Sequence, residues 1–226
     1  TNFVTWRYLS SDSRNVAFNV YRNGQKINKA PVTKSTSFED KYAGKEQTTY
    51  TVKSILNKKE QELQSYTLPA NAPVGYINIP LDVPQGGTTK DGEEYTYVAN
   101  DASIGDVDGD GEYEIFLKWD PTNAYDNAHK GITGNVYIDC IKLDGTKLWR
   151  IDLGKNIRAG AHYTQFMVFD FDNDGTAEIV IKTADGTIDG KGKVIGDAKA
   201  DYRNVNGYII EGPEFLTVFD GKTGQE

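Results

Sequence analysis

Two stretches of this sequence place acidic side chains at alternate positions, at residues 106–114 and 170–178. Ca²⁺ takes six to eight oxygen ligands from carboxylates and carbonyls, and a chain that wraps round the ion presents alternate side chains to it. A Gly at the sixth position of each stretch permits the sharp turn that this requires. We therefore predict two Ca²⁺ sites, with Glu112 and Thr176 offering backbone carbonyls. The predicted ligands are Asp106, Asp108, Asp110, Glu112 and Glu114 in the first, and Asp170, Asp172, Asp174, Thr176 and Glu178 in the second.

The sequence argues against one competing interpretation of these stretches and leaves another open. An EF-hand needs a bidentate Glu at position twelve, where this chain has Leu117 and Ile181. A plain Asp/Gly turn, held by side-chain to backbone hydrogen bonds, needs no metal and remains possible. Because the acids form a closed ligand set, we expect the metal to stabilise the fold rather than to perform chemistry.

The acidic stretches belong to a longer internal repeat. "DVDGDGEYEIFLK" at residues 106–118 matches "DFDNDGTAEIVIK" at residues 170–182, and "YIDCIKLDGTKLWRIDL" has a shorter counterpart in "EFLTVFDGKTGQE". The repeated unit is a loop, a strand, a variable excursion, a strand, an Asp-Gly turn and a strand, which suits a four-stranded propeller blade. A closed ring needs more blades than this chain supplies. We therefore expect residues 73–226 to be the first blades of a propeller, ending mid-blade, with the remaining blades as partners.

The first 72 residues predict a separate, small antiparallel β domain. Val16, Phe18 and Val20 alternate with smaller or polar residues, and Asn23-Gly24 follows as a hairpin signal. This pattern resembles a fibronectin type III or immunoglobulin-like sandwich. The whole chain is therefore predicted to be all-β, with domains at residues 1–72 and 73–226.

Composition excludes several classes of protein. The net charge of −8 makes nucleic acid a poor partner, because phosphate binding needs clustered Lys and Arg. No stretch approaches 18 apolar residues, so we expect no membrane span. Cys140 is the single cysteine, which rules out an intrachain disulfide, and its apolar surroundings predict a small buried side chain.

Three stretches resemble a known enzyme family. They are "YTYVANDASIGDVDGDGEYEIFLKWDP", "GNVYIDCIKLDGTKLWRIDLGKNIRAGAHYTQFMVFDFDNDG" and "KTADGT". The chain is similar to the N-terminal part of bacterial rhamnogalacturonan lyases of polysaccharide lyase family eleven. This resemblance implies a β domain followed by an eight-bladed propeller that holds several structural Ca²⁺ ions. It also implies cleavage of the rhamnose–galacturonate backbone of rhamnogalacturonan I, a pectic polysaccharide, by β-elimination outside the cytoplasm. The protein would then be secreted, at the cell surface or periplasmic.

The resemblance places Asn100 and Asp120 where the family contacts sugar. Each has a simpler interpretation, because Asp before Pro121 often starts a turn and Asn100-Asp101 can cap one. Asp101 could also add an oxygen to the first metal.

Removal of a weakly acidic uronate C5 proton requires that the neighbouring carboxylate be neutralised, which cations can do. Lys118 or Lys182 could pair with that carboxylate, although a charged residue at a strand end is the simpler and favoured explanation. Arg158 and His162 lie just before the second acidic stretch, where His162 could bind substrate or metal or simply pack. We predict no catalytic residue in this chain and expect the base in later blades. The rival hypothesis is a non-catalytic, calcium-dependent carbohydrate-binding or adhesion propeller.

Overall fold

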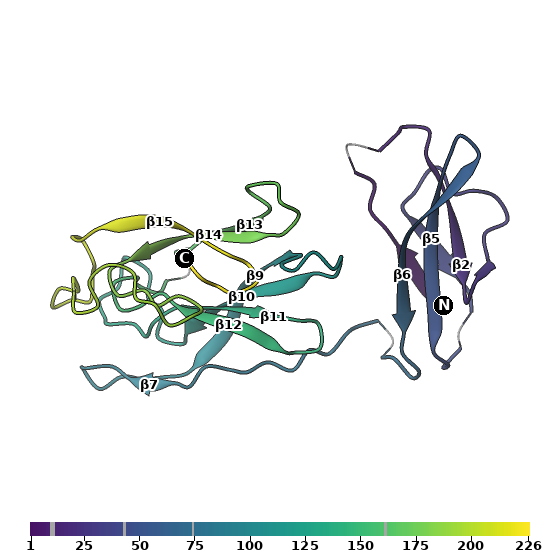
Figure 1. Ribbon diagram of the computed structural model, residues 1–226. Helices are drawn as coiled ribbons and strands as arrows, with labels where there is room; N and C mark the ends of the chain where they lie inside the picture. The colour runs from purple at the N-terminus through teal and green to yellow at the C-terminus, as the bar shows by residue number, and fades with distance from the viewer. Residues whose placement is uncertain (10–11, 43, 74, 161) are drawn as a thin grey trace. The chain divides into compact units, whose positions relative to one another are not determined.

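The computed structural model describes residues 1–9, 12–42, 44–73, 75–160 and 162–226, with the backbone alone for Glu62 and Leu63. These residues form fifteen β-strands and no helix, which confirms the all-β prediction. The described residues form no helix that is long and apolar enough to cross a membrane. The chain divides into two compact units, Thr1–Ile77 and Asn78–Glu226 (Figure 1).

The first unit contains two antiparallel sheets. One pairs β1 (Asn2–Thr5) with β4 (Ser37–Asp40). The other has the order β3-β2-β5-β6, built from β2 (Ala17–Arg22), β3 (Gln25–Lys26), β5 (Thr48–Leu56) and β6 (Lys59–Leu68). Asn23 and Gly24 join β2 to β3 with φ angles of 48° and 77°. Both central residues of a type I′ turn need positive φ, so the hairpin predicted from Asn-Gly is confirmed.

The second unit contains two larger antiparallel meanders and a short ribbon (Figure 1). The four-stranded meander has the order β12-β11-β10-β9, from β9 (Tyr97–Gly105), β10 (Glu114–Pro121), β11 (Tyr137–Ile141) and β12 (Lys147–Asp152). The three-stranded meander has the order β13-β14-β15, from β13 (Phe166–Phe169), β14 (Glu178–Ala184) and β15 (Glu214–Phe219). The ribbon pairs β7 (Gly87–Thr88) with β8 (Glu94–Tyr95).

The sequence repeat corresponds to a repeated hairpin. Glu114 pairs with Gly105 at the base of the first acidic loop, and Glu178 pairs with Phe169 at the same place in the second. The two loops touch, because the Ala177 N–H donates to the Asp106 carbonyl at 2.7 Å. Gly105 is required for this approach, since a Cβ there would lie 2.7 Å from the Ala177 Cβ.

One core of buried side chains joins the two meanders. Phe116, Ile138 and Ile151 come from the four-stranded sheet, whereas Ile179 and Phe219 come from the three-stranded sheet. Alternation along each strand directs these side chains inward, and their burial is the main force that holds the sheets together.

Cys140 lies in the same core with no exposed surface, as predicted. Burial raises the pKa of its thiol far above the usual range, so Cys140 is a packing residue and not a nucleophile.

Candidate functional site

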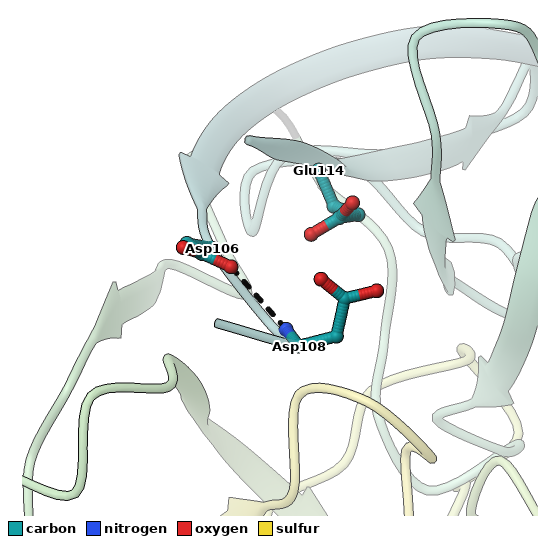
Figure 2. Close-up of side chains that lie close together, drawn as sticks. All are labelled: Asp106, Asp108 and Glu114. Carbon is teal, nitrogen blue, oxygen red and sulfur yellow. Dashed lines mark hydrogen bonds between the residues drawn. The ribbon is translucent and has the colours of Figure 1, made fainter. Parts of the chain in front are cut away.

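The first acidic loop gathers three carboxylates around one point. One oxygen each of Asp106, Asp108 and Glu114 lies within 4.8 Å of the others, and Figure 2 shows the three side chains converging. Asp106 follows the end of β9 and Glu114 begins β10, so the hairpin itself positions both. Glu114 is 2% exposed and its Oε2 accepts the Val107 N–H at 3.0 Å.

Backbone geometry closes this loop around Asp106. Its Oδ1 accepts the Gly109 N–H at 2.7 Å, and its Oδ2 accepts the Gly111 N–H at 2.9 Å. Gly109 and Gly111 have φ angles of 76° and 87°, a region that residues with a Cβ rarely adopt. The sixth-position Gly therefore has the role that the sequence predicted for it.

The donor set of this cluster fits a hard cation. The Oδ1 atom of Asp108 is buried and has no hydrogen-bond partner among the described residues, which is costly for a carboxylate oxygen unless a cation binds it. Lys142 Nζ lies 3.1 Å from Asp108 Oδ2 and 3.6 Å from Glu114 Oε1. Its hydrogen bond lowers the pKa of Asp108. Lys142 was not predicted from the sequence, where its position directly after β11 was the available signal. One ammonium opposes three carboxylates, so negative charge remains for a metal ion.

The second loop repeats the arrangement with Asp170, Asp172 and Glu178, whose carboxylate oxygens again lie within 4.8 Å of one another. Glu178 Oε2 accepts the Phe171 N–H at 2.8 Å, as Glu114 does with Val107. Burial, together with the charges of the nearby aspartates, raises the pKa of Glu178. Mutual repulsion of this kind is what a bound divalent cation would relieve.

The other acidic side chains of the two loops, Asp110, Glu112 and Asp174, are not members of these three-carboxylate clusters. Asp110 Oδ1 accepts the Glu112 N–H at 2.8 Å. In the second loop Asp174 Oδ1 accepts the Thr176 N–H at 2.8 Å and its hydroxyl at 2.7 Å. These are the bonds that a plain Asp/Gly turn predicts, and the same loops contain the convergent clusters as well.

A bulge between β9 and β10 forms a second polar site. The register shifts between Leu117 and Trp119, which leaves Lys118 without a partner on β9, although it pairs with Ile138 on β11. Lys118 is fully buried, and its Nζ donates to Asp101 Oδ2 at 2.8 Å and to the Tyr163 carbonyl at 3.3 Å. The expectation that Lys118 ends its strand is wrong, because β10 continues to Pro121. Asp101 is therefore paired with Lys118 and is not a member of the first acidic cluster.

Asp120 and Asn100 flank this bulge on neighbouring strands. Asp120 is 5% exposed, and burial raises its pKa while the charge of Lys118 acts in the opposite direction. Asn100 is exposed, and its Oδ1 accepts the Asp101 N–H at 2.7 Å. The fold thus places the Asp101 carboxylate next to Asn100, and the Asp101 carboxylate and the buried Lys118 ammonium near Asp120. Bulges commonly re-aim side chains in this way beside functional sites.

A buried ion pair holds β10 in place behind this site. The Trp119 indole N–H donates to Asp139 Oδ2 at 2.9 Å. Arg150 donates to both oxygens of the Asp139 carboxylate, each at 2.6 Å. Asp139 has no exposed surface, so one carboxylate ties β10, β11 and β12 together.

The remaining candidates are separated. Lys182 is exposed on β14 and pairs with Glu214 at 2.8 Å. Arg158 donates to the His129 carbonyl at 2.6 Å. His129 and His162 are exposed residues outside the strands.

Comparison with known protein families identifies the chain. Residues 76–226 match the model described as rhamnogalacturonan lyase family 11, C-terminal domain, and residues 1–69 match that of the rhamnogalacturonan I lyases β-sheet domain. The chain belongs to rhamnogalacturonan lyase family 11. The resemblance seen in the sequence is thereby confirmed.

Two curated relatives of this family 11 chain come from Bacillus subtilis (strain 168). The rhamnogalacturonan endolyase YesW is 61% identical over 224 residues, and the exolyase YesX is 56% identical over 223 residues. Both alignments cover 99% of this chain and 36% of the relative. The chain therefore spans about a third of the length of these proteins.

Solved structures of family 11 lyases have the same fold in this region. The crystal structure of YesW matches with a TM-score of 0.88 at 60% identity, covering 99% of this chain and 38% of that one. The Bacillus licheniformis rhamnogalacturonan lyase matches with a TM-score of 0.88 at 58% identity and the same coverage.

Proposed function

We propose that the protein carrying this chain cleaves the rhamnose–galacturonate backbone of rhamnogalacturonan I by β-elimination, and that this chain supplies part of its substrate site. The observation that carries the proposal is the identity of 61% and 56% to two proteins named as rhamnogalacturonan lyases, across 99% of the chain. Since one is an endolyase and the other an exolyase, the proposal does not extend to the mode of cleavage.

Asn100 and Asp120 are the proposed sugar contacts. Asn100 has an exposed amide N–H₂ that can donate to a sugar hydroxyl, since its oxygen already accepts the Asp101 N–H. Lys118 holds Asp101 and places positive charge near Asp120, which favours the ionised, hydrogen-bond-accepting form of that carboxylate. The catalytic base is proposed to lie in the rest of the protein.

The two acidic clusters are proposed to hold structural Ca²⁺ ions. When bound, each ion would offset two of the three negative charges of its cluster and lock a hairpin turn. Asp101, predicted to add an oxygen to the first metal, is left out of this proposal because its carboxylate pairs with Lys118. The two meanders are proposed as blades of a propeller completed by the rest of the protein. Residues 1–72 are proposed as a fibronectin-like or immunoglobulin-like sandwich, and the protein is proposed to act outside the cytoplasm.

The test is the ultraviolet absorbance of an unsaturated uronate when the complete protein meets rhamnogalacturonan. New absorbance is expected with the wild-type protein, and binding without new absorbance would support the carbohydrate-binding or adhesion propeller instead. Asn100→Ala and Asp120→Ala should each lower kcat/KM about tenfold or more, because each removes a hydrogen bond to the sugar. Asn15→Ala, an exposed Asn in the other unit, is the matched control.

A further inference from the structure

A pocket of about 580 Å³ opens beside the β9/β10 bulge. Its wall is formed by the segment before β13, by β14 and by the loop before β15. The six residues that matter for its chemistry are Arg158, Tyr163, Thr164, Lys182, Tyr208 and Glu214. Its volume is in the range of small-ligand sites, roughly 300 to 1,000 Å³.

Two polar side chains at this pocket have unused hydrogen-bonding capacity. Thr164 is 6% exposed, yet its hydroxyl has no partner among the described residues. Thr164 also has a φ of 62°, a strained conformation for a β-branched residue. The Arg158 Nε is likewise buried without a partner. Unsatisfied buried groups are rare in folded proteins, and two of them at one pocket indicate a missing ligand.

The charge of the pocket is positive in a protein of net charge −8. Arg158 donates to the carbonyls of Asp126, His129 and Gly131, and no carboxylate lies within ion-pair distance of it in the described part of the chain. Lys182 pairs with Glu214, but both side chains are largely exposed, so this pair is weak and can exchange partners. One uncompensated positive charge therefore remains for a ligand.

Aromatic rings complete the site. The Arg158 guanidinium lies 4.9 Å from the centre of the Tyr208 ring, which fixes both groups at the pocket wall. The Tyr163 hydroxyl accepts the Asn127 N–H at 2.8 Å, which orients its ring. A sugar ring has an apolar face and hydroxyl groups along its edge. Aromatic rings that lie beside hydrogen-bonding groups suit a ligand of this kind.

Tyr163 links the pocket to the bulge. Tyr163 lines the pocket, and its backbone carbonyl accepts a hydrogen bond from Lys118. Lys118 in turn pairs with Asp101 and lies near Asp120. Tyr163 is thus shared by the two sites, which places the pocket next to the bulge.

We infer that this pocket binds the carboxylated sugar of the substrate, with Lys182 and Arg158 facing the carboxylate and Thr164 bonded to the ring. The inference rests on the proposed function and adds a uronate subsite to it.

The experiment compares D-galacturonate with D-galactose, which differ only at the carboxylate, by ligand-observed NMR on the complete protein. Galacturonate should bind about tenfold more tightly, because a charge-assisted hydrogen bond is about twice as strong as a neutral one. Lys182→Gln should weaken galacturonate binding about threefold to fivefold, as expected for an exposed charge. Lys191→Gln, which removes an exposed Lys elsewhere, should not.

Thr164→Val separates a binding role from a structural one. The change removes the hydroxyl without changing the shape of the side chain, so it should weaken galacturonate binding roughly threefold to tenfold. The melting temperature should stay the same or rise, because an unpaired buried hydroxyl is lost. If Thr164→Val instead lowers the melting temperature, or if both variants bind galacturonate like the wild type, the pocket is filled by another part of the protein and the inference is wrong.

The two proposals can fail separately. Binding that depends on Lys182 and Thr164 without formation of unsaturated uronate would retain the subsite and overturn the lyase. Full lyase activity with unchanged kcat/KM in both variants would retain the lyase and overturn the subsite.

Discussion

Asp139→Ala is the sharpest test of how the fold positions β10. The substitution leaves the Arg150 guanidinium without its bidentate partner and the Trp119 indole N–H without an acceptor. Asp139 is fully buried, and Arg150 is 23% exposed. Removal of one partner of a buried ion pair costs about 3 to 5 kcal/mol, and the partial exposure of Arg150 favours the lower end.

That loss corresponds to a large thermal shift. In a domain of about this size each 1 kcal/mol lowers the melting temperature by about 2 to 4 °C, so about 3 kcal/mol predicts a fall of about 6 to 12 °C. Tryptophan fluorescence can follow the transition, because Trp119 and Trp149 both lie in the unit Asn78–Glu226.

Two comparisons show whether the unpaired charge is the cause. Asp82→Asn alters an exposed carboxylate that pairs with Lys147, and should leave the transition unchanged. Asp139→Leu combined with Arg150→Met removes both charges, and should be more stable than Asp139→Ala. A melting temperature for Asp139→Ala within about 2 °C of the wild type would refute this account.

Three further predictions concern other parts of the chain. Chelation of divalent cations should lower the melting temperature of Asn78–Glu226, since an ion present at 100 times its Kd stabilises by about 2.7 kcal/mol per site. Gly105→Ala should destabilise the same unit by about 1 to 3 kcal/mol, because its Cβ would overlap Ala177 and Val168 in a close-packed contact. In the first unit burial opposes ionisation of Asp40, but bonds from Tyr50, Tyr42 and Arg22 hold its pKa below the usual value. Its contribution to stability is thus present above about pH 4 and is lost as the pH falls through the lowered pKa, and Asp40→Asn should flatten that dependence.

Each of these has a contrary outcome. An unfolding curve that chelators leave unchanged would remove the metal interpretation of the acidic clusters. Equal melting temperatures for Gly105→Ala and the wild type would show that the two hairpins can separate. An acid transition of the first unit that is the same in Asp40→Asn and the wild type would exclude Asp40 as its source.

Local sequence by itself determined the β2–β3 hairpin and the two acidic loops. Asn23-Gly24 predicted a type I′ turn because few residues tolerate positive φ at both central positions. The alternating acids and the Gly at position six predicted the acidic loops for the same local reason. By contrast, Asn57 and Lys58 form the β5–β6 turn at φ angles of 52° and 65° without any Gly, and the sequence did not reveal that turn or β6.

Only the tertiary structure decided which charged groups meet. Lys118 and Lys182 occupy the same place in the sequence repeat, but Lys118 is fully buried beside Asp101 and Tyr163 whereas Lys182 is exposed beside Glu214. A repeat records the spacing of residues along one strand, and burial depends on which distant segments pack over that strand. For the same reason Lys142, which faces the first acidic cluster, and Thr164, which faces the pocket, could be recognised only in the folded chain.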